Sequence, residues 1–141
     1  MDYKRMKDTY YERIDKGEEI ITSLMDVCRK EGIGSAVFTG IGGCDVAEIQ
    51  TFIPETGSFE TEKVTGMLEL IHVTGNIVSD ETGALFHHTH AVLSYKDGTE
   101  HKIKTFTGTY SWKHFCFWVV VQIKAFKIFA NLFAQFNKTP V

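Results

Sequence analysis

A series of short apolar segments, separated by tight-turn signals, constrains the fold of this 141-residue chain most strongly. The segments are either apolar throughout or alternate between apolar and polar residues, as buried and half-buried β-strands do. We expect strands over residues 35–39, 46–53, 68–73 and 86–95. Turns are indicated at residues 55–57, 80–83 and 96–98, the last with an Asp-Gly hairpin signal. The series predicts an α+β fold, mainly antiparallel β-sheet.

One amphipathic helix near the N-terminus accompanies these strands. Asp15 and Glu18 have the spacing of a capping box, in which Glu follows an acceptor side chain by three residues. Gly32 is suited to end the helix in a left-handed conformation. Apolar residues recur at helical spacing between these signals, namely Ile20, Ile21, Leu24, Val27 and Cys28. The helix is therefore expected from near Asp15 to Gly32, within a single domain of residues 1–141.

The most informative chemical motif is His88-Thr89-His90, which His87 extends to a triplet. Residues i and i+2 of a strand point to the same face, so His88 and His90 should present two imidazoles side by side. Such a pair can begin a metal site or an acid/base pair. The plain alternative is two surface or hydrogen-bonded histidines. A zinc-like divalent ion is the cofactor that this motif suggests.

A metal site needs at least one further protein ligand, and the spacing of residues does not select it. The histidine candidates are His72, His101 and His114, and the carboxylate candidates are Glu69 and Asp97. Gly40-Ile41-Gly42-Gly43 lacks the Lys-Ser/Thr of a phosphate loop, so a bulge or tight turn is expected there. No cofactor-binding motif other than the histidines is indicated.

Charged and aromatic residues are unevenly distributed along the chain. All 18 acidic residues lie within residues 1–100, which also hold 9 of the 15 basic ones, so this part carries 9 − 18 = −9. Residues 101–141 carry +6, both tryptophans and seven of the eleven phenylalanines. Phe126, Phe129, Phe133 and Phe136 have amphipathic helical spacing. Residues 105–141 thus form an atypical, aromatic, acid-free tail, which could pack in an oligomer or bind a partner or membrane surface.

The compartment is expected to be the cytoplasm. No apolar run follows the charged first residues, so a signal peptide is not predicted, and no stretch suits a transmembrane helix. Cys28, Cys44 and Cys116 are odd in number and widely spaced, which favours buried free thiols in a reducing compartment.

The order of motifs over residues 10–100 resembles the plants-and-prokaryotes conserved (PPC) domain. The segments that carry the resemblance are Gly17-Glu18-Glu19-Ile20-Ile21, the run A-V-F-T-G-I-G-G from Ala36 to Gly43, Leu68 to Ile77 with Gly75-Asn76-Ile77, and Gly83 to Leu93 with the His-x-His. The resemblance implies a compact domain of largely antiparallel sheet that assembles as an oligomer, often a trimer. It also implies that His88 and His90 belong to a metal-holding histidine cluster.

The chain departs from the family after residue 105. The family completes its histidine cluster with a downstream Gly-Gly-His, whereas this chain reads T-G-T-Y-S-W-K-H from Thr107 to His114. A shifted reading frame would account for the missing motif and for the acid-free, aromatic ending. Sequencing the encoding DNA tests this explanation.

Two functions follow from the resemblance and the residues. Bacterial members of the family are commonly described as candidate DNA-binding proteins, which favours a non-enzymatic, oligomeric, DNA-associated regulator. The charge of −9 on residues 1–100 repels phosphate, so tight duplex binding by the domain alone is not expected. The alternative is a metal-dependent enzyme or small-molecule binder centred on His88 and His90.

Overall fold

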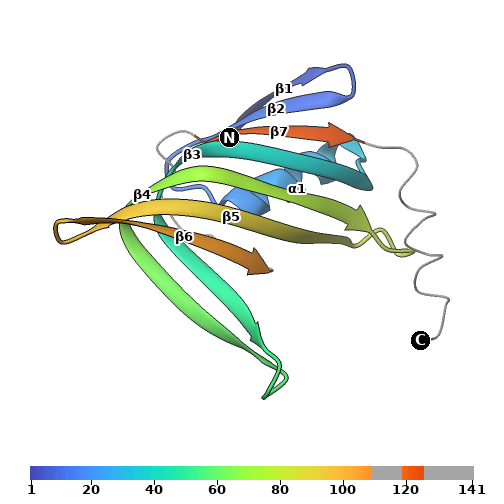
Figure 1. Ribbon diagram of the computed structural model, residues 1–141. Coiled ribbons are helices and arrows are strands. Elements are labelled where there is room, and N and C mark those ends of the chain that lie inside the picture. The colour runs from blue at the N-terminus through green and yellow to red at the C-terminus, as the bar shows by residue number, and fades with distance from the viewer. Residues whose placement is uncertain (109–118, 126–141) are drawn as a thin grey trace.

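The computed structural model describes residues 1–108 and 119–125, which form one antiparallel sheet and one helix (Figure 1). The elements in chain order are β1 (Asp2–Met6), β2 (Thr9–Ile14), α1 (Ile20–Glu31), β3 (Ser35–Ile53), β4 (Ser58–Ser79), β5 (Leu85–Asp97), β6 (Glu100–Gly108) and β7 (Val119–Ala125). The sheet order is β1-β2-β7-β3-β4-β5-β6. The predicted fold class, mainly antiparallel sheet with one N-terminal helix, is confirmed.

The helix α1 covers one face of the sheet. Its apolar stripe packs onto inward-facing residues of the strands, and the largest fully buried apolar side chains are Phe38, Ile14, Ile20, Leu24, Leu68, Leu70, Ile77, Leu93 and Ile123. Alternation along each strand places the other side chains on the opposite face, which we call the outer face. Thr74 and Asn76 of β4 and their partners on β5 belong to this outer face.

Helix α1 begins at Ile20, five residues later than predicted. Glu19, not Asp15, is its N-cap, and the Glu19 carboxylate accepts hydrogen bonds from the backbone N–H groups of Ile21 and Thr22. Asp15 and Glu18 instead form a turn before the helix, in which the Asp15 N–H donates to Glu18 Oε2 at 2.8 Å. Gly32 ends the helix in the left-handed conformation, as predicted, with φ of 65°.

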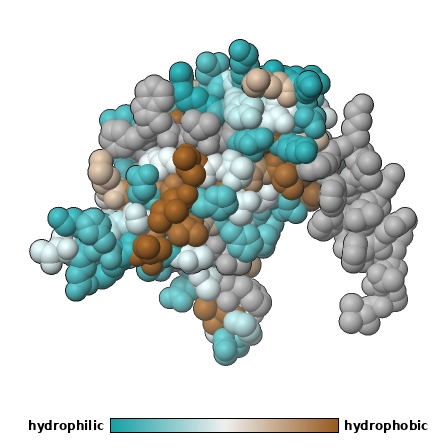
Figure 2. Space-filling view, turned by 45° about the horizontal axis from the view of Figure 1, so that its top comes forward, coloured by the Kyte–Doolittle hydropathy of each residue, from teal (hydrophilic) through white to brown (hydrophobic). Residues whose placement is uncertain are grey.

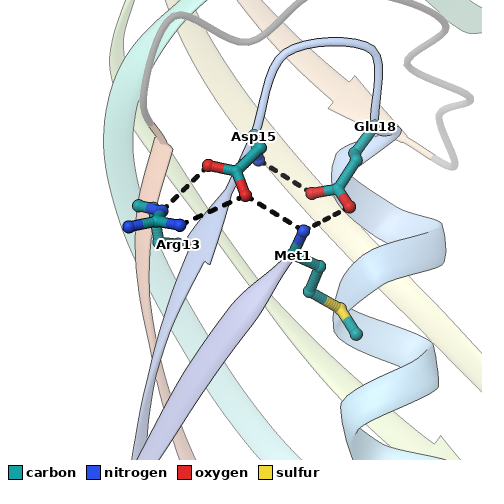
Figure 3. Close-up of polar contacts among 4 residues, drawn as sticks. All are labelled: Met1, Arg13, Asp15 and Glu18. Atoms are coloured by element: carbon teal, nitrogen blue, oxygen red, sulfur yellow. Dashed lines mark hydrogen bonds and ion pairs between the residues drawn. The ribbon is translucent and has the colours of Figure 1, made fainter.

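The N-terminal amine ties β1 to this turn (Figure 3). The Met1 ammonium donates to Asp15 Oδ2 at 3.2 Å and makes a short hydrogen bond with Glu18. The Arg13 guanidinium contacts the other Asp15 oxygen at 2.8 Å, and this hydrogen bond lowers the pKa of Asp15. The hydrogen bond that the Met1 ammonium donates to Glu18 is the main reason that the pKa of this ammonium is raised. The network links β1, β2 and the start of α1.

The strands are longer than the sequence predicted. Strand β4 continues through Gly75 and Asn76, where the sequence analysis placed the end of a strand. Strand β3 runs without interruption from Ser35 to Ile53, and the glycine run at Gly40 to Gly43 contains a bulge, one of the two expected alternatives. Strands β1 and β2 were not predicted. The 80–83 turn and the 96–98 hairpin are confirmed.

Strands β3 and β4 extend beyond the rest of the sheet as a two-stranded arm (Figure 1). The arm pairs residues 46–53 with residues 58–65 and follows a second bulge between Cys44 and Val46. Lys104 of β6 forms an ion pair with Glu62 of the arm, and Lys63 pairs with Glu48 at 3.2 Å. These ion pairs connect the arm to β6 and its two strands to each other.

The late strand β7 lies inside the sheet, between β2 and β3. Ile123 is fully buried and pairs with Tyr10 on one side and Phe38 on the other. The apolar run at residues 115–121 of the sequence predicts a buried strand, and β7 begins within that run at Val119. The predicted amphipathic helix at Phe126 to Phe136 lies outside the described residues.

Candidate functional site

Strand β5 places His88 and His90 on the outer face of the sheet. His88 lies opposite Asn76 of β4, and His90 lies opposite Thr74. Thr89, between them, and Ala91, after His90, point the other way, since both are buried beneath the sheet. The alternation predicted for a strand is therefore present, and it presents both imidazoles to the same side.

Gly75 sets the backbone on which the histidines stand. A Cβ atom at Gly75 would lie 2.3 Å from the backbone oxygen of His88 and 2.6 Å from the Phe38 ring. Real Cβ atoms do not approach other atoms this closely, so the close packing of Phe38 under β4 and β5 requires glycine here. Gly75 therefore belongs to the site as a positioning residue, a role that its place in the Gly75-Asn76-Ile77 motif did not by itself indicate.

The two imidazoles converge on one point. His88 Nε2 and His90 Nε2 are 3.1 Å apart, with ring centroids 4.9 Å apart and ring planes 70° to each other. Two nitrogens bound to a tetrahedral zinc ion at 2.0–2.1 Å would be separated by roughly 3.3 Å. The donor spacing thus fits two positions on one metal ion. A hydrogen bond from one neutral imidazole to the other also satisfies this distance.

His87 does not join this pair. Its Nδ1 lies 3.0 Å from the Thr89 hydroxyl, so it follows the alternation toward the covered face. Burial is the largest cause that lowers the pKa of His87. A neutral His87 suits a hydrogen bond with buried Thr89 and gives no ligand to the outer face. The histidine triplet of the sequence is thus divided between the two faces.

The described residues do not gather a third ligand at the pair, since residues 1–108 and 119–125 hold no group of three or more His, Cys, Asp or Glu side chains suited to a metal ion. His72 shares the outer face, opposite Val92, while Glu69 lies opposite Ser94. His101 lies opposite Lys96 near the β5–β6 hairpin, where Asp97 is paired with Lys102. His114 lies outside the described residues.

The outer face also carries exposed apolar side chains. Ile41, Met67, Ile71 and Ile103 are 61%, 80%, 43% and 68% exposed. Ile103 aligns with Ser94 and Glu69 on the outer face, and Ile41 and Ile71 occupy bulges in β3 and β4. Figure 2 shows hydrophobic side chains gathered in a band across one face of the molecule. We call Ile41, Met67, Ile71 and Ile103 the apolar patch. Its outward-facing Met67 could have been found from strand alternation.

A hollow of about 340 Å³ lies elsewhere, along the N-terminal hairpin. It is open to solvent and is lined by Asp2, Tyr3, Lys4, Tyr11, Glu12 and Arg13. Strands β7, β3 and β4 separate this hairpin from β5. The hollow therefore does not supply a substrate cavity beside His88 and His90. Residues 1–108 and 119–125 also contain no helix with the length and apolar character needed to span a bilayer.

Comparison with known proteins shows the family to which the chain is similar. The model of the Plants and Prokaryotes Conserved (PCC) domain, the family abbreviated PPC above, matches residues 1–125. The match includes β7, and it therefore takes in residues 105–125 of the segment that the sequence analysis described as an atypical tail. No curated protein matches the chain.

Several solved structures share the fold. A "putative DNA-binding protein" from Bacteroides thetaiotaomicron is similar with a TM-score of 0.77 and 20% identity, covering 89% of this chain and 84% of that one. A plant- and prokaryote-conserved protein from Pyrococcus horikoshii has a TM-score of 0.68 and 28% identity, covering 90% and 84%. A metal-containing protein from Archaeoglobus fulgidus has a TM-score of 0.70 and 20% identity, covering 88% and 82%.

Proposed function

Because this chain belongs to the Plants and Prokaryotes Conserved domain family, we propose that it is an oligomeric, DNA-associated regulatory protein that binds a divalent metal ion, such as zinc, through His88 and His90. The observation that carries the metal assignment is the 3.1 Å separation of the two Nε2 atoms on an accessible strand face. A bound zinc ion would supply a positive charge and a fixed geometry there. The function proposed for it is structural.

Two histidines leave coordination positions open on a tetrahedral ion. Oligomerisation supports the proposal because a neighbouring copy can bring further ligands to the same outer face. The apolar patch gives a reason for association, since exposed apolar side chains are stabilised when a partner covers them. A trimer is the assembly that we propose, with the histidine pair near the contact between copies.

The DNA association proposed here is indirect. Residues 1–100 carry a net charge of −9, so this part of the chain repels the negatively charged phosphates of DNA. The described fold neighbour from Bacteroides thetaiotaomicron bears a DNA-binding name, which supports a role near DNA without assigning a contact surface. We place the protein in the cytoplasm, where the buried thiol of Cys28 would stay reduced.

Metal content and DNA binding should be measured in the same preparation. We expect stoichiometric zinc in the wild-type protein by elemental analysis after zinc loading and desalting, and its loss in both His88→Ala and His90→Ala. His101→Ala is the matched control, because His101 lies at the other end of β5 and β6 and should leave the zinc content unchanged. Equal metal content in all four proteins would exclude the site.

Assembly and DNA binding complete the test. Light scattering should report a trimer, and a monomer at all concentrations would contradict the proposed assembly. A gel shift at moderate salt should show weak binding to duplex DNA by the protein alone. Tight binding that persists when residues 126–141 are removed would contradict indirect association. A small organic molecule that copurifies at His88 and His90 would favour the small-molecule binder instead.

A further inference from the structure

Glu12 is a carboxyl group buried in the core with no hydrogen-bond partner. It occupies an inward position of β2 between Tyr10 and Ile14, and it is 1% exposed. Neither of its carboxyl oxygens has a hydrogen-bond partner. An ionised carboxylate is very costly in such a place, whereas a neutral carboxylic acid costs much less. The site therefore favours the protonated form.

The charged groups around Glu12 do not neutralise it. Glu18 of the turn before α1 opposes its ionisation most strongly, and Asp26 of α1 adds to this effect. The Met1 ammonium and Lys30 of α1 act in the opposite direction. Tyr3 of β1, which pairs with Glu12, and Cys28 of α1 also interact with it electrostatically, and neither provides a cation.

Burial, the largest cause, and the neighbouring carboxylates raise the pKa of Glu12 from 4.5 to about 8. The folded protein then holds a proton that the unfolded chain releases near pH 4.5. Below pH 4.5 the contribution of Glu12 to the free energy of unfolding is at its full value. This contribution falls as pH rises toward 8, and the folding equilibrium constant then decreases by up to about tenfold per pH unit. Above pH 8 the dependence on this group ends.

The position of β2 determines where the loss of stability should appear. Strands β1 and β2 form a hairpin at one edge of the sheet, held by β7 on one side and by the Met1 network at the turn. An edge hairpin opens at lower free energy than an interior strand such as β4. We infer that Glu12 is a buried protonation switch, which keeps the β1–β2 hairpin docked under α1 while neutral and loosens the hairpin when it ionises.

Glu12→Gln tests the switch, because the amide has the size of the carboxyl group but cannot ionise between pH 5 and 9. Urea unfolding at fixed ionic strength should show wild-type stability falling from pH 5 to 8, with no such fall in the variant. Glu12→Leu provides a second neutral side chain in case the buried amide prevents folding. Glu60→Gln, a change at an exposed carboxyl on the arm, is the control and should follow the wild type.

Hydrogen exchange locates the effect. After correction for the intrinsic rate, exchange of β1 and β2 amides in the wild type should accelerate up to about tenfold per pH unit relative to Glu12→Gln, while β4 and β5 amides change less. Parallel stability profiles for the wild type and both Glu12 variants would overturn the switch. Equal acceleration in all strands would overturn its assignment to the hairpin.

Discussion

The histidine region of β4 and β5 and the N-terminal hairpin of β1 and β2 both carry polar side chains on sheet strands, with opposite consequences. His88 and His90 stand on the outer face, where they contact each other and remain accessible. Glu12 stands on the covered face without a hydrogen-bond partner. The comparison shows that the face of the strand, more than the residue type, decides whether a titratable group can meet a ligand or instead affects folding.

Gly75→Ala is expected to have the largest effect among the variants that sharpen this comparison. The added methyl group would collide with the His88 backbone and the Phe38 ring, neither of which can move without shifting β5 or the core. We expect a loss of about 3 kcal/mol in the free energy of unfolding, measured with urea. The variant should also lose zinc, because the histidine strand is displaced.

Gly34→Ala is the matched control for Gly75→Ala. A Cβ at Gly34 would meet the Ser79 hydroxyl at 2.8 Å, which is the end of a side chain that can rotate away. The loss in the free energy of unfolding should therefore be clearly smaller for Gly34→Ala than for Gly75→Ala. Equal losses for the two alanine variants would show that the site does not depend on close packing at Gly75.

Thr89→Val is expected to have an intermediate effect. Thr89 is fully buried under the histidine strand, and its hydroxyl lies 3.0 Å from His87 Nδ1. Valine keeps the shape but leaves the half-buried His87 without this partner, which should cost about 1–2 kcal/mol in urea unfolding. Zinc binding by His88 and His90 should persist, because those side chains lie on the other face. Loss of zinc at unchanged stability would contradict this separation of the faces.

Glu19→Ala, a change in the N-terminal region, should have the smallest effect of these variants on the free energy of unfolding. The variant removes the carboxylate that accepts hydrogen bonds from Ile21 N and Thr22 N at the first turn of α1. We expect a loss of about 1 kcal/mol, measured by thermal or urea unfolding. Asp15→Ala is the comparison, since the sequence assigned the cap to Asp15. A larger loss of α1 hydrogen-exchange protection in Asp15→Ala would favour the original assignment.

Much of the histidine region could be predicted from the sequence. Local alternation identified β5 and the shared face of His88 and His90, and the Asp-Gly signal identified the hairpin that follows. The end of β4 was placed too early because glycine is usually a strand breaker, whereas Gly75 is used for close contact with Phe38. The third ligand could not be chosen, because spacing along the chain does not report which strands become neighbours.

The N-terminal region was predicted less well. Strands β1 and β2 are short and rich in charged residues, so their local pattern resembles a solvated segment. Their hairpin joins the rest of the sheet through pairing of β2 with β7, which lies more than a hundred residues later in the chain. The burial of Glu12 depends on the same long-range pairing and on the packing of α1. The sequence pattern near Glu12 therefore does not predict that its side chain is buried.

The sequence by itself determined the α+β class, the helix end at Gly32, the hairpin after β5 and the common face of two imidazoles. These features follow from local periodicity and turn chemistry. Only the tertiary structure decided that β7 lies between β2 and β3, that the Nε2 atoms of His88 and His90 lie 3.1 Å apart, and that the Glu12 side chain is buried. The physical reason is that strand order and burial arise from contacts between segments distant in sequence, which local patterns do not encode.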